Sequence, residues 1–285
     1  METRIHISNV MKEKFKIVLD TWRMTFGLFK QNPAVLIPFL LVGLLDASIL
    51  LLIYLAPRPP LSALLAPPIR AFWGERFLHY PFNLLLIPRL FDYGHIFSTA
   101  FMGVLMTGAA IGMLKQAGEG LKPKIFFNLV KSLRMYLRLL VIWLIMFGLV
   151  TAAFRGLPAV FHFKQGAASQ MVLSAAFLIS ILIEAFFINA IPAVIIEEKK
   201  TWTAIKRGIS FSKSALLPTL ILVASPTLIY IPMIILRGKL PLLMNKLFPE
   251  AVLIFLGIGI IISVIVDCLI TSSTAILFLN KKKDE

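Results

Sequence analysis

Residues 251–279 read AVLIFLGIGIIISVIVDCLITSSTAILFL, and this stretch decides the class of fold. Its one charged residue is Asp267. A helix needs about 20 consecutive apolar residues to cross the hydrocarbon of a bilayer. The stretch therefore predicts a transmembrane helix, long enough to tilt or to extend beyond the bilayer.

Five further apolar runs approach the length of a span, near 34–56, 95–114, 136–154, 171–196 and 215–236. Across the chain 59% of residues are hydrophobic, whereas soluble domains average roughly 45–50%. We therefore expect an all-α, polytopic protein with six transmembrane helices, forming a single integral membrane domain over residues 1–285.

Basic residues give an orientation. The 29 Lys and Arg outnumber the 14 Asp and Glu. Twenty of the 29 fall in the N-terminal segment, the segments after the second and fourth runs, and the C-terminal segment, and nine fall in the others. Cytoplasmic loops carry the excess of Lys and Arg, so we expect both termini in the cytoplasm and a location in the cytoplasmic (inner) membrane.

Three of these basic segments have helical amphipathic periodicity, and each directly precedes a pair of spans. Such helices lie in the headgroup plane, with apolar side chains toward the bilayer and Lys or Arg toward lipid phosphates. The pattern predicts three hairpins, each preceded by a cytoplasmic interfacial helix. The residues expected to anchor these helices to anionic lipid are Trp22, Arg23, Lys30, Lys131, Arg134, Trp202, Lys206 and Arg207.

The outer segments 57–93, 155–170 and 237–250 are rich in apolar and aromatic residues. Aromatic residues favour the membrane–water interface, so these segments are expected to lie on the outer surface of the bilayer. A surface that binds a partner protein is the alternative, and the sequence does not separate the two.

Three acids lie inside predicted spans: Asp46, Glu184 and Asp267. An ionised carboxylate at the bilayer centre costs at least about 2.5 kcal/mol on insertion scales, and such residues often mark proton or ion pathways. One hypothesis is that the three acids converge as a proton or cation site. The other is that they are neutral groups that hydrogen-bond neighbouring helices.

Prolines and glycines add two features. The fifth run holds Pro218, Pro226 and Pro232, and proline removes a backbone donor and tends to kink a helix. Broken helices line binding sites in many transporters, although static kinks are commoner. Gly108 and Gly112 form a small face that predicts close packing of another helix.

No catalytic, metal or nucleic-acid motif stands out. Cys268 is the one cysteine, which excludes an intrachain disulfide, and no histidine has metal-ligand spacing. We expect no cofactor and no metal. An enzyme is the third-ranked hypothesis, because it requires His79, Asp92 and His95 to converge on the outer side.

Two cytoplasmic segments carry a resemblance. One is Trp22-Arg23-Met24-Thr25-Phe26 with Phe29-Lys30-Gln31-Asn32-Pro33, and the other runs from Glu197 through Trp202 to Gly208. Together they resemble a group of uncharacterised bacterial six-span proteins that includes the membrane domain attached to some glycerophosphodiester phosphodiesterases. The resemblance implies a bacterial inner-membrane location. These 285 residues include no soluble domain, so it implies no hydrolase activity.

The leading functional hypothesis is a non-catalytic membrane scaffold or complex subunit. It would engage anionic membrane lipids through the basic helices and bind another membrane protein, but no nucleic acid. The alternative is a proton- or cation-coupled transporter of a lipid-like or small amphipathic solute, in which the intramembrane acids carry the coupling ion.

Overall fold

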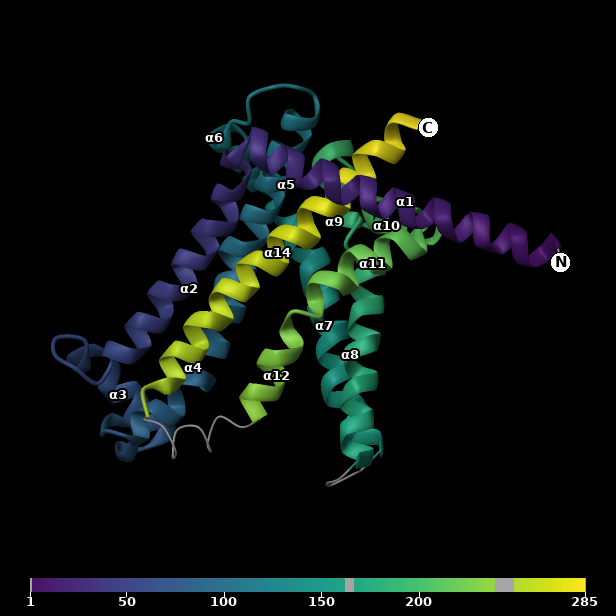
Figure 1. Cartoon of the computed structure of the whole chain (residues 1–285). Helices are drawn as coiled ribbons and strands as arrows, with labels where there is room; N and C mark the ends of the chain where they lie inside the picture. The colour runs from purple at the N-terminus through teal and green to yellow at the C-terminus, as the bar shows by residue number, and fades with distance from the viewer. Residues whose placement is uncertain (1, 162–166, 239–248, 285) are drawn as a thin grey trace. The chain divides into compact units, whose positions relative to one another are not determined.

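The computed structural model describes residues 2–161, 167–238 and 249–284. Within these ranges all regular structure is helical (Figure 1), which confirms the all-α prediction. Five of the described helical stretches are long and apolar enough to cross a membrane: Pro33–Leu55, Phe82–Gly118, Tyr136–Ala159, Gln170–Glu197 and Ala251–Lys282. A sixth span results if the bent pair of helices Thr201–Ser214 and Leu216–Thr227 is counted as one span. The chain is therefore a multi-pass, membrane-embedded protein.

The second span begins earlier than predicted. Helix α4 (Phe82–Ser98) continues through a π-helical turn, η3 (Thr99–Gly103), into α5 (Val104–Gly118). The prediction placed the start at residue 95 and assigned residues 82–93 to an outer segment. It was wrong because Pro88, Arg89 and Asp92 interrupt the apolar run without ending the helix.

The fifth predicted span, 215–236, is not one helix. Helix α11 (Leu216–Thr227) and α12 (Tyr230–Gly238) are separate. Prolines explain the break, because Pro226 lies two residues before it and Pro232 lacks the N–H that would bond to the preceding turn. The pair that approaches the length of a span is α10 (Thr201–Ser214) with α11, and the two helices meet at 97°.

The chain divides into two compact units, which are described separately. Unit 1 comprises residues 1–38, 104–228 and 268–285. It contains α1 (Glu2–Gln31), the 3₁₀ turn η1 (Pro33–Leu36), α5, α6 (Ile125–Arg134), α7 (Tyr136–Phe161), α8 (Ala167–Phe187), α9 (Ala190–Glu197), α10, α11 and the end of α14 (Ala251–Asp284). Helices α7 and α8 lie side by side as a hairpin (Figure 1). A cluster of buried side chains that includes Ile111, Ile195 and Phe278 forms its core.

Unit 2 comprises residues 39–103 and 229–267. It contains most of α2 (Ile37–Leu55), α3 (Ser62–Trp73), the 3₁₀ turn η2 (Glu75–Leu78), α4, η3, α12 and the first half of α14. Its core is formed by α2, α4 and α14, with Leu50, Ile87 and Val252 among the buried residues. The segment 57–93, which was predicted to lie on the outer side, is thus mostly helical. Residues 162–166 and 239–248 of the other two outer segments lie outside the described residues.

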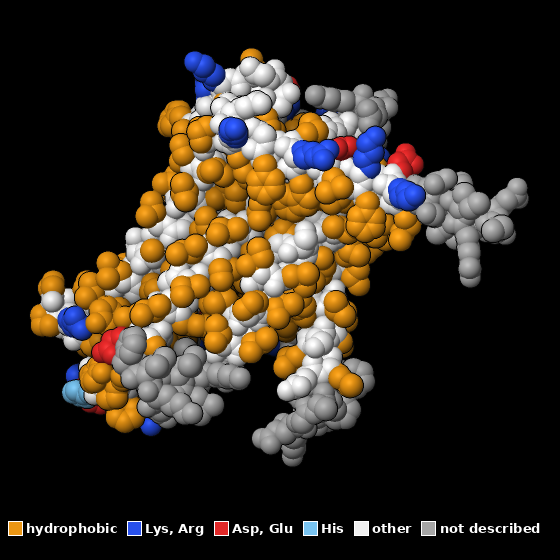
Figure 2. All heavy atoms as spheres, viewed as in Figure 1, with side chains coloured by type: hydrophobic (Ala, Val, Ile, Leu, Met, Phe, Trp, Pro, Cys, Tyr) orange, Lys and Arg blue, Asp and Glu red, His pale blue; other side chains and the backbone are white. Residues whose placement is uncertain are grey.

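Helices are present at all three positions that were predicted to be interfacial, as α1, α6 and α10. Helix α6 buries Asn128 and Ser132, and it exposes Phe126 and Leu133. In Figure 2, Lys and Arg side chains lie along α1. A helix that turns its small polar residues toward the protein and its large apolar residues outward fits a surface solvated by lipid.

Candidate functional site

The most deeply buried acid of unit 2 is held by two side chains of a neighbouring helix. Asp46 on α2 is 2% exposed. The Ser98 hydroxyl donates a hydrogen bond of 2.5 Å to Oδ1 of Asp46, and Nδ1 of His95 lies 3.0 Å from Oδ2. His95 and Ser98 are three residues apart on α4, so they share one helix face. Both carboxylate oxygens are therefore engaged from the same helix.

Glycines allow the helices to meet at this carboxylate. A Cβ on Gly94 of α4 would lie 2.6 Å from Cγ2 of Ile49 on α2. A Cβ on Gly43 of α2 would lie 2.5 Å from Cγ2 of Val264 on α14. Both neighbours are β-branched and stiff at χ1. Asp46 lies one helical turn from each contact. Because Gly94 and Gly43 have no side chain, α4 and α14 can both approach α2 closely near Asp46.

Two further acids act electrostatically on His95. The charges of Asp92 and Asp267 both act on His95, in addition to that of Asp46. Asp267 is on α14, where it is exposed and lies 3.4 Å from the Ser263 hydroxyl. Unit 2 thus contains two of the three intramembrane acids that the sequence singles out, and the charges of both act on His95. The third, Glu184, is half-buried on α8 of unit 1.

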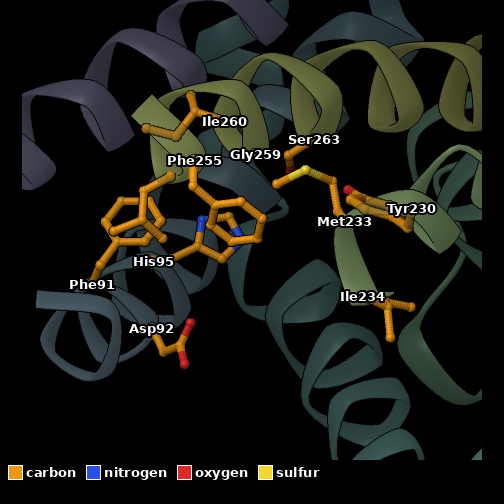
Figure 3. A pocket seen from close by; sticks show the side chains of 11 residues that line it. Phe91, Asp92, His95, Tyr230, Met233, Ile234, Phe255, Gly259, Ile260 and Ser263 are labelled. Carbon is orange, nitrogen blue, oxygen red and sulfur yellow. The ribbon is translucent and has the colours of Figure 1, made fainter. Parts of the chain in front are cut away.

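His95 opens onto a cavity of about 210 Å³ (Figure 3). Its side chain is 38% exposed, in contrast to that of Asp46. The lining consists of Phe91, Asp92 and His95 from α4, Tyr230, Met233 and Ile234 from α12, and Phe255, Leu256, Gly259, Ile260 and Ser263 from α14. The Phe91 ring stacks on the His95 ring at 6.0 Å between centroids. The cavity is therefore apolar and aromatic, with its charged groups gathered on α4.

Two departures from regular helix occur next to this cavity. The π-helical turn η3 follows Ser98 directly, and α12 begins at the cavity-lining Tyr230, just after the break from α11. π-Bulges occur frequently at functional sites, and broken helices line the binding sites of many transporters. Among the described residues no group of three or more His, Cys, Asp or Glu could hold a metal ion.

His79 and His95, the two histidines of the hypothetical catalytic group, belong to different pairs. His79 lies 3.8 Å from Glu75, outside the spans, and His95 lies next to Asp46. The Arg70 guanidinium donates hydrogen bonds to Glu75 and lowers the pKa of that carboxyl. Of the three residues in the hypothetical catalytic group, Asp92 and His95 line one cavity. His79 is not among the residues that line it.

The predicted lipid anchors comprise two cations paired with acids of the same unit, five exposed residues and one half-buried tryptophan. Lys131 lies 2.7 Å from Glu198, and its ammonium group lowers the pKa of that carboxyl, while Arg207 lies 3.6 Å from Glu197. These two cations hold α6 and α10 to the end of α9. The exposed members are Arg23, Lys30, Arg134, Trp202 and Lys206. Trp22 is half-buried and stacks on Phe26 at 5.7 Å between ring centroids.

Sequence reasoning missed Ser98 and the pairing of His95 with Asp46. The available signal was the spacing of His95 and Ser98 on one helix face, which the misplaced start of the second span concealed.

No protein-family model, curated protein or solved structure matches this chain. The resemblance to the membrane domain of some glycerophosphodiester phosphodiesterases therefore stays a prediction.

Proposed function

We propose that this chain is a proton-coupled transporter of small amphipathic cations. The observation that carries the proposal is the Asp46–His95 pair, with 3.0 Å between Oδ2 and Nδ1, in the wall of an aromatic cavity. Ionisable residues inside membrane spans are rare and mark proton and ion pathways. This reverses the order of the two leading sequence-based hypotheses.

The partners differ in exposure, and that difference supports a proton relay. Asp46 is sealed at 2% exposure, whereas the His95 side chain is 38% exposed and lines the cavity. Histidine is the side chain whose ordinary pKa lies nearest neutral pH. His95 is therefore the member that exchanges protons with the cavity, while Asp46 stabilises its protonated form. Protons on such a close pair belong to the pair as a whole.

The charge balance favours a cation as the solute. The charges of three acids, Asp46, Asp92 and Asp267, act on His95. When His95 releases its proton, the site becomes more negative by one charge and attracts a cation in its place. Aromatic rings also bind cations through their faces, and Phe91, Tyr230 and Phe255 line the cavity. One proton leaves as one monovalent cation enters.

Exchange can be measured with the purified full chain in liposomes. Ethidium, an aromatic cation, serves as the probe; luminal DNA reports its entry and luminal pyranine reports pH. With an acidic lumen, we expect ethidium uptake together with luminal alkalinisation. Asp46→Asn and His95→Gln should abolish both signals. Asp20→Asn, which changes an acid on α1 outside the cavity, is the matched control. Size-exclusion chromatography checks that each variant is folded.

Two outcomes contradict the proposal. If the Asp46→Asn protein is folded and exchanges ethidium for protons at the wild-type rate, the Asp46–His95 pair is not required for exchange. If liposomes with the wild-type protein show neither uptake of ethidium nor a change of luminal pH, the protein does not transport this cation in exchange for protons.

A scaffold that engages anionic lipid is the second candidate, and helix α6 favours it. Phe126 is 76% exposed and Phe127 is 59% exposed, and exposed Lys124 and Arg134 lie at the two ends of the same short helix, Lys124 as its N-cap. Such a face suits either anionic lipid or a partner membrane protein. Native mass spectrometry of gently extracted protein tests it: a second polypeptide at fixed stoichiometry, lost on Phe126→Ala with Arg134→Glu, supports the scaffold.

A further inference from the structure

We infer that unit 1 holds a binding site for the headgroup of one anionic glycerophospholipid. The site is a cavity of about 300 Å³, separate from the Asp46–His95 cavity and independent of the proposed transport function. Helices α1, α5, α9 and α14 line it, so all of its walls belong to one compact unit.

The lining has two chemical parts. Apolar side chains come from α1, α9 and α14, among them Leu28, Ile196 and Ile276. The charged groups are the ammonium groups of Lys115 and Lys282 and the carboxylate of Glu119. A ligand that satisfies both parts carries negative charge next to hydrocarbon. A phosphodiester attached to a glycerol backbone and acyl chains has this form.

The charges leave a net positive site. Lys115 lies 3.9 Å from Glu119, at the limit of an ion pair, and the Glu119 side chain is 48% exposed. Exposed ion pairs of this kind are weak. Basic pockets between transmembrane helices bind anionic headgroups at the membrane surface. Two ammonium groups against one weakly paired carboxylate therefore attract one phosphate.

Neighbouring lysines of α14 have different surroundings, which provides an internal control. Lys281 donates a hydrogen bond to the Ser214 hydroxyl and lies over the Phe211 ring at 5.1 Å. Lys282, the next residue, lines the cavity. Asn280 Nδ2 lies 3.2 Å from the sulfur of Met24, so α14 and α1 are joined at the cavity itself.

Gly118 is a position at the cavity wall where a side chain can be added without changing the charge of the lining. It lines the cavity, and a Cβ at this position would have no neighbour within 4 Å. A phenylalanine at position 118 therefore places its ring in open space. Headgroup binding should be lost although both lysines remain.

The test uses the delipidated full chain and native mass spectrometry. The probes are phosphatidylglycerol, phosphatidylcholine with the same acyl chains, and inorganic phosphate. We expect one tightly retained phosphatidylglycerol and no comparable retention of phosphatidylcholine. Lys115→Gln with Lys282→Gln should weaken retention by on the order of tenfold or more. Gly118→Phe should also abolish retention, and Lys281→Gln should leave it unchanged.

Three results would overturn the inference. Equal retention of both lipids removes the charge recognition. Unchanged retention in the Lys115→Gln, Lys282→Gln protein removes the site. Binding of inorganic phosphate that displaces phosphatidylglycerol assigns the cavity to a soluble anion instead of a lipid.

Discussion

At the scale of single residues, Asp46 receives a hydrogen bond from Ser98 at 2.5 Å and lies 3.0 Å from His95. A buried carboxylate that loses a donor carries the cost of its desolvation without compensation. Ser98 is itself 3% exposed, so water cannot easily replace its hydroxyl. The serine therefore stabilises the charged form of the acid that the proposed function requires.

Replacing this serine tests its role. We expect Ser98→Ala to lower the free energy of unfolding by about 1–3 kcal/mol, because Oδ1 of Asp46 loses its donor. The measurement is the thermal unfolding midpoint in detergent. Ser48→Ala is the control, since the Ser48 hydroxyl is exposed and donates to Leu44 O on its own helix. If the unfolding midpoint falls equally in Ser98→Ala and Ser48→Ala, the prediction is wrong.

At the scale of helices, α5 and α6 pack through glycine. The Asn128 amide oxygen occupies the space beside Gly112, and the Ser132 hydroxyl the space beside Gly108. Hydrogen bonds add to this contact: Asn128 donates to Gln116 at 2.8 Å, and Ser132 donates to Leu105 O at 2.7 Å. Small residues and interhelical hydrogen bonds are the usual means of helix association in membranes. The predicted small face of Gly108 and Gly112 is thus confirmed as a packing surface.

A methyl group at this contact should separate the two helices. Gly112→Ala places a Cβ against the Asn128 amide, and overpacking of this kind costs about 1–3 kcal/mol. Gly148→Ala on α7 is the control, because its Cβ meets nothing within 4 Å. We expect a clear loss of thermal stability for Gly112→Ala only. A wild-type midpoint in Gly112→Ala would show that α6 is not held by this contact.

At the scale of the whole molecule, the distribution of Lys and Arg predicts that both termini are cytoplasmic. The proposed lipid site depends on this orientation, because anionic lipid is concentrated in the cytoplasmic leaflet. The lipid-site residues Lys115 and Lys282 come from the segments that are predicted to be cytoplasmic, and the outer segment 57–93 carries Arg76.

Cysteine labelling measures this orientation. In a Cys268→Ala background, Lys12→Cys and Lys122→Cys should be protected from a membrane-impermeant maleimide in intact cells, and Arg76→Cys should react. All three positions are exposed, so burial does not limit labelling. The reverse pattern would invert the topology and move the lipid site to the outer leaflet.

The amino-acid sequence by itself determined the class of protein and the position of most helices. A span must satisfy its backbone groups internally and be apolar over about 20 residues, and both properties are local. The starts of the third and sixth predicted spans, at residues 136 and 251, coincide with helices α7 and α14. The sequence also located Asp46 and Asp267 as acids inside spans.

Only the tertiary structure decided which groups meet. Asp46 and His95 are 49 residues apart, and no periodicity relates them. Lipid is as apolar as a protein core, so the pattern of a helix does not distinguish a face that packs against protein from one that contacts lipid. For this reason the sequence could not predict that α6 buries Asn128 and Ser132, that Lys131 pairs with Glu198, or that Lys115 and Lys282 share a cavity.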